Sequence, residues 1–423
     1  MTRTRTLLRA ATGMACLLLA VGRPIPVPVA ANPLRQPPRV VWGEPQVAWQ
    51  TAGTVSAPQL VTDAAQRTHL FFLETSGDGA TLYHAPVSDG PLMPVDIHVG
   101  QYSEFRAAAD ASGSLHVLLH GIGNSLLLTS APADKAGSAS AWSPVVQIEE
   151  APLGSDLSAD SRGRLHLCFA SGQDLKHSLS EDGGLRWSDS EVIAQMREAD
   201  GIAVEERCVA DSEGILHAAW SEVTPPDYYP SLGLWYSRSV DDGQTWDEPQ
   251  QLAGEHYTLP SFLADRKGLL HLIWQGDVAV GGRFYRQRAP GRDGGWSPTE
   301  TIIAANDGGM SGIAGMALDS LDRLHAVIAI DKGSVWTARG ASWLAPVMLT
   351  GSLNDLPNES GSVGEGPTLA ISQGSLRRGS AAIYLPVHHP EIEEFVELRR
   401  PTGGDPNRKA LNLHHGILVT DAF

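Results

Sequence analysis

Several short segments of this chain combine carboxylates, arginines and aromatic rings. They include Gln101–Arg106, Glu205–Arg207, Val223–Tyr229, Gly254–Tyr257 and Gln275–Arg283. Aromatic rings stack on the apolar faces of sugars, and charged groups hydrogen-bond their polar substituents, so this composition suits a glycan or another polar organic ligand. The alternative is that these are ordinary solvated loops. The candidate ligand-binding residues are Glu206, Arg207, Tyr228, Tyr229, Asp277 and Arg283.

Six histidines each follow an aspartate by six residues, most clearly in the form Asp-x-x-Gly-x-Leu-His. Each pair belongs to a different repeat, so the six histidines are too far apart to share one metal ion. We expect an Asp–His hydrogen bond that braces a hairpin, with no metal and no cofactor. The pairs are Asp63/His69, Asp110/His116, Asp160/His166, Asp211/His217, Asp265/His271 and Asp319/His325.

The Asp–His pairs recur every 47 to 54 residues. This period is typical of a four-stranded propeller blade, and the intervening runs, such as Leu270–Trp274, are of β type. The sequence therefore predicts an all-β protein, a β-propeller of four-stranded blades. In the fourth repeat the strands A to D are expected at 207–210, 215–220, 234–239 and 248–252.

Both ends of the repeat bear on how the ring closes. A degenerate seventh unit is expected from Pro367–Ile371, Ser380–Leu385 and Glu393–Leu398, without a fourth strand. Trp42–Gln46 copies Trp246–Gln250 at four of five positions, which predicts that the N-terminal strand supplies that missing outer strand. We therefore expect seven blades, with six as the alternative. The predicted organisation is a signal peptide at 1–31, a Pro-rich leader at 32–39, the propeller at 40–405 and a tail at 406–423.

Two copies of the pattern Ser-x-Asp-x-Gly-x-x-Trp stand 59 residues apart, at Ser180–Trp187 and Ser239–Trp246. The pattern resembles the Asp-box, or BNR repeat, of sialidase-like propellers. The resemblance implies a hairpin turn between strands C and D, in which the motif is structural and lies on the face opposite the ligand site. The residues concerned are Ser180, Asp182, Gly184, Trp187, Ser239, Asp241, Gly243 and Trp246.

The sialidase resemblance also implies candidate catalytic residues. Sialidases use an arginine triad, a Tyr/Glu nucleophile pair and an aspartate; Arg106, Glu205 and Tyr257 carry over to these roles. However, Glu222 ends the strand where the second arginine is expected. The leading hypothesis is a non-catalytic recognition module for a glycan or extracellular protein. The alternatives are a divergent sialidase-like exo-glycoside hydrolase and an extracytoplasmic assembly factor or scaffold, so whether the chain is an enzyme stays open.

The N-terminus and the composition indicate where the protein acts. Three arginines precede an apolar run from Ala11 to Val21, and Val29-Ala-Ala31 fits a cleavage site, which predicts a secreted or extracytoplasmic protein without a membrane span after processing. The net charge of −17 argues against nucleic acid as a partner. Cys168 and Cys208 either pair or remain as two buried thiols. We expect a monomer.

Overall fold

The computed structural model describes most of the chain between residues 54 and 350 and short segments outside it. The described residues are 7–11, 16–18, 45–50, 54–76, 79–87, 92–121, 125–150, 154–226, 230–277, 279–305, 314–318, 323–330, 333–340, 342–350, 382–386 and 414–418. Within these ranges the structure is all β apart from one short 3₁₀ turn at Ala139–Ala141. No helix in the described part of the chain is long and apolar enough to cross a membrane.

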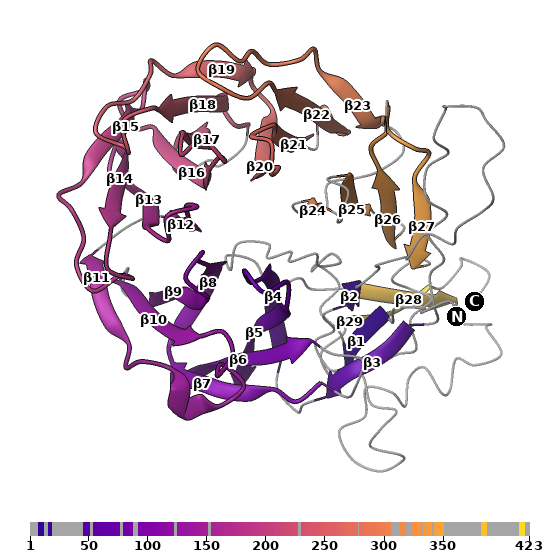
Figure 1. Cartoon of the computed structure of the whole chain (residues 1–423). Coiled ribbons are helices and arrows are strands. Elements are labelled where there is room, and N and C mark those ends of the chain that lie inside the picture. Colours follow the sequence, from indigo (N-terminus) through magenta and orange to yellow (C-terminus); the bar gives the residue numbers. More distant parts are fainter. Residues whose placement is uncertain are drawn as a thin grey trace, which may run out of the picture.

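Six four-stranded antiparallel sheets are arranged as the blades of a propeller (Figure 1). Each blade takes its strands in chain order from the centre of the ring outward. Blade 1 consists of β4 (Thr54–Thr62), β5 (Thr68–Ser76), β6 (Gly79–Val87) and β7 (Val95–Gly100). Blade 2 consists of β8 (Tyr102–Ala109), β9 (Ser114–Gly121), β10 (Ser125–Pro132) and β11 (Val146–Glu150). Blade 3 consists of β12 (Gly154–Ala159), β13 (Leu165–Ser171), β14 (Asp174–Ser180) and β15 (Glu191–Gln195).

Blades 4 to 6 repeat this order. Blade 4 consists of β16 (Ile202–Ala210), β17 (Leu216–Val223), β18 (Gly233–Ser239) and β19 (Gln250–Ala253). Blade 5 consists of β20 (Tyr257–Ala264), β21 (Leu270–Gly276), β22 (Arg283–Arg288) and β23 (Glu300–Ile303). Blade 6 consists of β24 (Gly315–Leu318), β25 (Leu324–Ile330), β26 (Gly333–Ala338) and β27 (Val347–Thr350). The strands predicted for the fourth repeat correspond to β16–β19, with the inner strand longer than expected.

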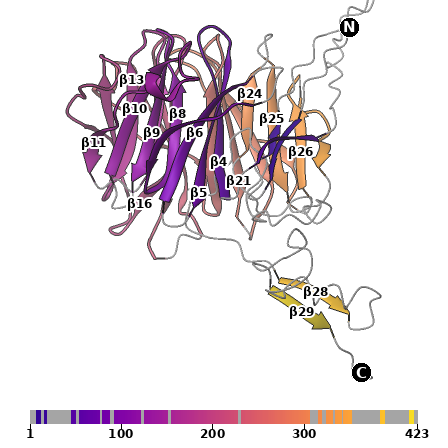
Figure 2. The same ribbon diagram turned by 90° about the horizontal axis from the view of Figure 1, so that it is seen from below.

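The expectation of seven blades is wrong and its alternative, six blades, is confirmed; the predicted closure of the last blade by the N-terminal strand is wrong. β3 (Pro45–Gln50) pairs in parallel with β1 (Leu7–Ala11), which also pairs with β2 (Cys16–Leu18). In the predicted seventh unit, β28 (Ala382–Pro386) pairs in parallel with β29 (His414–Leu418). A blade requires antiparallel neighbours, so neither pair completes one. Figure 2 shows the β28–β29 pair away from the ring. Residues 367–371 and 393–398 lie outside the described segments.

The core lies between neighbouring blades, because both faces of each sheet are covered. Clusters of buried side chains join blade 1 to blade 2 around Phe71 and Phe105, and blade 4 to blade 5 around Trp274. The second strand of a blade is enclosed most completely; every residue of β17 and β21 is buried. This explains why neither strand shows a strict alternation of apolar and polar residues.

The repeated aspartates brace the turns between first and second strands. In blades 1 to 5, Oδ1 of the aspartate accepts the backbone N–H four residues later at 2.8–2.9 Å. The paired histidine places Nε2 3.0–4.0 Å from Oδ2 of the same aspartate. Asp319 lies outside the described segments. These turns and those between third and fourth strands share one face of the ring, here called the turn face; the other connections form the loop face.

Candidate functional site

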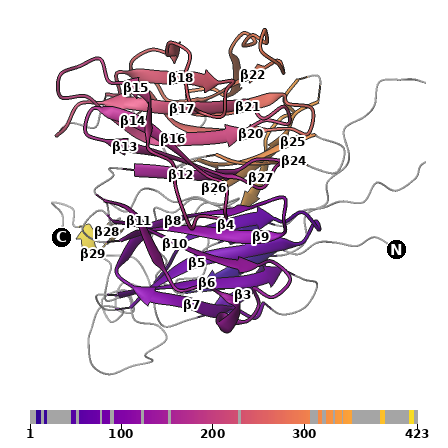
Figure 3. The same ribbon diagram turned by 60° about the vertical axis from the view of Figure 1, so that its left-hand side comes forward.

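Arg106 is the centre of a charged cluster on the innermost strands of the blades, a region here called the channel wall. It projects from β8; β12 lies between β8 and β16 around the centre of the ring (Figure 3). Its Nη1 donates to the Phe105 carbonyl at 3.0 Å and lies 3.3 Å from Glu104 Oε2. Its Nε lies 3.7 Å from Asp156 Oδ1 on the next blade. The side chains of Glu104, Arg106 and Asp156 are only 13–18% exposed, so their charges interact at short range and with little screening.

Arg207 brings a second guanidinium to the cluster from β16. Its Nη1 donates to the Glu206 carbonyl at 2.7 Å. Burial and the neighbouring Arg106 lower the pKa of Arg207, while Asp156, Glu206 and Glu104 act in the opposite direction. Two arginines and three carboxyl groups from three successive blades therefore interact in one network.

Glu206 has the most unusual environment of these carboxyls. It is 2% exposed, and neither Oε1 nor Oε2 has a hydrogen-bond partner among the described residues. Burial raises its pKa to about 7, against the lowering effects of its backbone hydrogen bond and of Arg207 and Arg106. A carboxyl with a pKa near neutrality beside ionised partners can exchange a proton under physiological conditions.

Glu205 is held rigidly by the neighbouring blade. Its backbone has φ +58° at a bulge in β16, a conformation that costs free energy for a residue other than glycine. Its Oε2 accepts hydrogen bonds from Thr258 Oγ1 (2.5 Å), the Leu259 N–H (2.6 Å) and Ser221 Oγ (3.1 Å). Burial nonetheless raises its pKa. Because this single oxygen accepts all three hydrogen bonds, Glu205 is better placed to hold β16 against β20 than to bind a ligand.

Asp156 links the site to a disulfide. Burial raises the pKa of Asp156, against the lowering effects of Arg207 and Arg106, and its Oδ2 accepts the Cys208 N–H at 2.9 Å. Cys208 is bonded to Cys168 on β13, with the two Cα atoms 6.3 Å apart. The sequence left this pairing open. The bridge joins blade 3 to blade 4 one residue after Arg207.

His120 closes the cluster on the side of blade 2. Its Nε2 lies 2.5 Å from Ser155 Oγ and 3.8 Å from Glu104 Oε1. Burial lowers the pKa of His120 to about 4. Burial acts to raise the pKa of Glu104, but Arg106, His120 and Arg207 outweigh it, and the net direction is down. At neutral pH the cluster therefore holds a neutral imidazole beside an ionised Glu104.

Other predicted site residues lie elsewhere. The ring of Tyr257 packs edge-on against Phe284, 5.3 Å between centroids, in the apolar cluster between blades 4 and 5. Asp277 Oδ2 lies 2.7 Å from His256 Nδ1. Arg283 is buried on blade 5, one blade away from Arg207. Tyr228 and Tyr229 lie outside the described segments. Of the arginine triad and Tyr/Glu pair that a sialidase requires, the described residues assemble two arginines and no tyrosine.

The two Ser-x-Asp motifs lie on the turn face, between β14 and β15 and between β18 and β19. Asp241 Oδ1 accepts the Thr245 N–H at 2.9 Å, and Ser239 Oγ accepts the Gly243 N–H at 2.8 Å. The first motif repeats this arrangement through Asp182, with Arg186 N–H at 2.9 Å, and Ser180, with Gly184 N–H at 2.8 Å. Both glycines have φ near +90°, as such a turn requires. The Trp187 and Trp246 rings pack against neighbouring apolar clusters.

Sequence reasoning missed Asp156 and His120. A usable signal was present, because the residue four positions before each repeated aspartate lies at the same place on an inner strand. In blades 2, 3 and 4 these residues are Arg106, Asp156 and Arg207, which alternate in charge. The described residues contain no cluster of three or more His, Cys, Asp or Glu side chains suited to a metal ion.

Comparison by sequence finds a match confined to the C-terminal end of the chain. Residues 365–423 match the family model of the ribonucleotide reductase barrel domain. The ribonucleoside-diphosphate reductase large subunits of Invertebrate iridescent virus 6 and Invertebrate iridescent virus 3 are 50% identical over 56 residues and 56% over 54, which is 13% of this chain in each case. The chain spans 6% and 8% of those two proteins.

The matched segment includes residues 367–398, whose apolar runs predicted a seventh blade. It covers the whole of that predicted unit and leaves the six blades outside it. Short apolar runs such as Ala382–Pro386 suit a strand of any sheet, so they imitate a degenerate blade when read one at a time.

Comparison by structure concerns the propeller. An ulvan lyase of polysaccharide lyase family PL25, solved with a bound GlcA-Rha3S segment, aligns with a TM-score of 0.50 and 11% identity over 69% of this chain and 84% of that one. A protein of unknown function from Dyadobacter fermentans has a TM-score of 0.47 and 13% identity, over 68% and 92%. A Penicillium chrysogenum α-L-arabinanase has a TM-score of 0.41 and 14% identity, over 65% and 86%. The likeness to the lyase supports the propeller fold and nothing finer.

Proposed function

We propose that this protein is a secreted propeller that recognises a neutral or amino-substituted glycan at the channel wall. The observation that carries the proposal is the network of Arg106, Arg207, Glu104, Asp156 and Glu206, which is assembled from three blades and in which the side chains of Glu104, Arg106 and Asp156 are 13–18% exposed. Sugar hydroxyls both donate and accept hydrogen bonds, so they suit a site that presents carboxylate acceptors beside guanidinium donors.

The charge balance of the network selects the class of sugar. With Glu205 included, four carboxyl groups surround two arginines, and both arginines already interact with carboxylates. Carboxyl groups therefore outnumber guanidinium groups in the network. A sialic acid carboxylate would enter a field of its own sign, whereas a neutral or cationic sugar would not. This argues for a ligand other than the anionic sugar that the sialidase resemblance suggests.

Secretion is part of the proposal and rests on two features. The N-terminal segment has the composition of a signal peptide, and the Cys168–Cys208 disulfide is of the kind that persists in oxidising compartments. The ulvan lyase with the similar fold was solved with a bound polysaccharide segment, which supports a carbohydrate ligand.

A second candidate function is glycoside hydrolysis, which the state of Glu206 favours. A protonated carboxyl near neutral pH, close to ionised Glu104, has the properties of the general acid in a two-carboxylate mechanism. The absence of a tyrosine from the network, within the described residues, separates this candidate from a sialidase. Recognition without cleavage remains the first proposal, because Glu206 is only 2% exposed and its carboxyl is enclosed between blades.

A glycan array tests both candidates. We expect the full-length protein to bind neutral or amino-sugar glycans, and Arg207→Ala to weaken binding at least tenfold, because a charge-assisted hydrogen bond contributes about 1.5–3 kcal/mol. Arg162→Ala, on the turn face, is the matched control and should bind normally. Binding restricted to sialylated glycans, or no dependence on Arg207, would reject the proposal; release of free sugar that Glu206→Gln abolishes would favour the hydrolase.

A further inference from the structure

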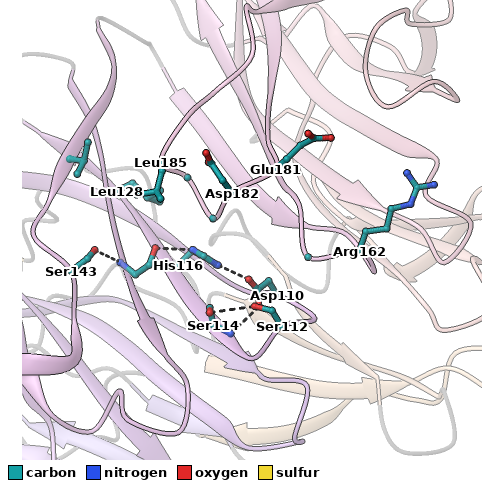
Figure 4. A pocket seen from close by; sticks show the side chains of 15 residues that line it. Asp110, Ser112, Ser114, His116, Leu128, Ser143, Arg162, Glu181, Asp182 and Leu185 are labelled. Atoms are coloured by element: carbon teal, nitrogen blue, oxygen red, sulfur yellow. Dashed lines mark hydrogen bonds and ion pairs between the residues drawn. The ribbon is translucent and has the colours of Figure 1, made fainter.

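The turn face carries a pocket of about 510 Å³ between blades 2 and 3 (Figure 4). It is lined by the aspartate turn and third strand of blade 2 and by the Ser180–Trp187 hairpin of blade 3. Its polar walls include Ser112, Ser114, Ser130 and Ser143. Neither the glycan proposal nor the Asp-box resemblance uses this pocket.

The pocket exists because blade 2 departs from the pattern of the other blades. In blades 1, 3, 4 and 5, the repeated histidine uses Nδ1 to contact a large ring on the third strand at 2.8–3.1 Å; these rings are His84, His177, Tyr236 and Tyr285. In blade 2 the corresponding residue is Leu128, which has no polar atom. Its histidine, His116, instead contacts the smaller Ser130, with Nδ1 2.8 Å from Oγ.

A second difference between the blades adds to the open space beside Ser130. Between blades 3 and 4, Arg164 occupies the corresponding space and places Nη2 2.6 Å from Asp242 Oδ1. The equivalent position in blade 2 is Ser114, so no long side chain crosses the gap to blade 3. The result is an open site beside Ser130 where the next pair of blades is filled.

Ser130, His116 and Asp110 form a hydrogen-bonded chain in this pocket. Figure 4 shows the His116 and Asp110 side chains of this chain. His116 Nε2 lies 3.0 Å from Asp110 Oδ2. Burial acts to raise the pKa of Asp110, but hydrogen bonds from His116, the Ser114 N–H and Ser112 Oγ lower it to about 2. Asp110 is therefore an ionised acceptor, which places the imidazole proton on Nε2 and leaves Nδ1 to accept the Ser130 hydroxyl proton.

We propose that Ser130 is a nucleophile activated by His116 and Asp110, and that this pocket hydrolyses small uncharged carboxylic esters. The three roles match those of a Ser-His-Asp triad, with the two ring nitrogens exchanged. The carboxylates of Asp110, Glu181 and Asp182 line the pocket against the single cation Arg162, which disfavours an anionic ester.

The reaction proceeds in two balanced steps. His116 Nδ1 takes the Ser130 proton as Oγ attacks the ester carbonyl carbon; the C–O bond to the alcohol then breaks, and the alcohol leaves with that proton. Water, deprotonated by the same nitrogen, attacks the acyl-serine, releasing the carboxylic acid and returning the proton to Ser130. Ser143 Oγ, which accepts the Ser130 N–H at 3.0 Å, retains its own proton and is the candidate donor to the oxyanion.

The corresponding contacts in other blades are structural, and two features separate Ser130 from them. Tyr236 and Tyr285 are buried, and burial raises the pKa of both phenols above the usual range, so neither is a nucleophile at neutral pH. Ser130 is a primary alcohol on the wall of an open pocket. The same Asp–His brace thus acquires a reactive partner in blade 2 alone among blades 1 to 5.

Covalent labelling of the full-length protein with a fluorophosphonate probe tests this proposal. We expect a phosphonyl adduct on Ser130, located by peptide mass spectrometry, with loss of fluoride. Ser130→Ala should abolish the adduct and His116→Gln should slow it at least 100-fold. The control is His166→Gln, which removes the equivalent brace of blade 3 and should label normally.

A second arm guards against a variant that fails to fold. In Ser130→Cys, alkylation by iodoacetamide at pH 7 should be at least tenfold faster than in Ser130→Cys/His116→Gln, because His116 deprotonates the thiol and the thiolate is the reactive form. Absence of an adduct at Ser130 in the folded wild-type protein, or equal alkylation rates in the two cysteine variants, would overturn the proposal.

Discussion

Gly154, on β12, lies directly against the buried carboxyl of Glu206, on β16. A β-carbon at residue 154 would stand 2.6 Å from Glu206 Oε1 and 3.0 Å from Oε2. Since Glu206 is enclosed between two blades, it has little room to withdraw. Glycine at 154 is therefore what admits a carboxyl at this point of the network.

Gly154→Ala is expected to destabilise the protein by about 1–3 kcal/mol, because overpacking of an enclosed site forces side chains or strands to shift. Urea denaturation measures the change. Gly295→Ala, where no heavy atom lies within 4 Å of an added β-carbon, is the matched control and should change little. The double variant Gly154→Ala/Glu206→Ala should recover part of the loss; strictly additive effects would contradict the contact.

The protein is expected to lose stability as the pH rises from about 4.5 to about 7. Glu206 has a pKa of about 7 when folded and 4.5 as the reference, so in this interval the folded state holds a proton that the unfolded chain releases. The expected loss is on the order of 1–3 kcal/mol. Asp156 and Glu205, whose pKa values burial also raises, act in the same direction.

Denaturation of wild type and Glu206→Gln at pH 4.5 and pH 7.5 measures this dependence. The neutral amide cannot titrate, so the variant should show a smaller decline than the wild type. Identical pH profiles would mean that Glu206 does not hold its proton in the folded state. Below about pH 4 the opposite effect sets in, since the lowered pKa of Asp110 makes its ionised form part of the native structure.

Loss of the Cys168–Cys208 disulfide is expected to cost about 2–4 kcal/mol, because the bridge closes a loop across 40 residues of sequence. It should also weaken glycan binding, since Cys208 supplies the N–H that holds Asp156. Cys168→Ser/Cys208→Ser, compared with wild type by thermal denaturation and on the glycan array, measures both effects. A double variant with wild-type stability would show that blades 3 and 4 need no covalent tie.

Truncation after residue 364 is expected to leave the propeller intact. The deletion removes β28 and β29, which pair only with each other among the described strands, together with the segment that matches the reductase barrel domain. We expect an unchanged β-type circular dichroism spectrum and a cooperative melt within a few degrees of the full-length chain. Loss of the β signal would indicate that the C-terminal segment is required to close the ring.

The features that could be predicted from sequence are those built from contacts within a few residues. Asp110 binds a backbone N–H four residues on and His116 six residues on, and Ser239 binds Gly243 four residues on, so each repeat leaves a motif that can be read directly. The same locality made the four-stranded blade predictable. It also led to the wrong prediction of ring closure. Trp42–Gln46 is similar to Trp246–Gln250 in local sequence, but local sequence does not specify which sheet a strand joins.

The channel site could be predicted only in part. Arg106 and the run Glu205–Arg207 were identified by their composition, but nothing in their own segments shows that Asp156 lies between them or that Tyr257 turns away toward Phe284. Those relationships depend on how neighbouring blades pack. Asp156 meets Cys208 across 52 residues, and Thr258 meets Glu205 across 53.

The sequence by itself determined the repeat, the braced turns and the all-β architecture, because short β-type runs and short hydrogen-bonded turns are encoded in adjacent residues. Tertiary structure alone decided the number of blades, the partners of each channel charge and the pocket beside Ser130. These depend on side-chain volume and charge between blades about 50 residues apart, where a leucine in place of a ring, or a glycine beside a carboxyl, changes what the surface can bind.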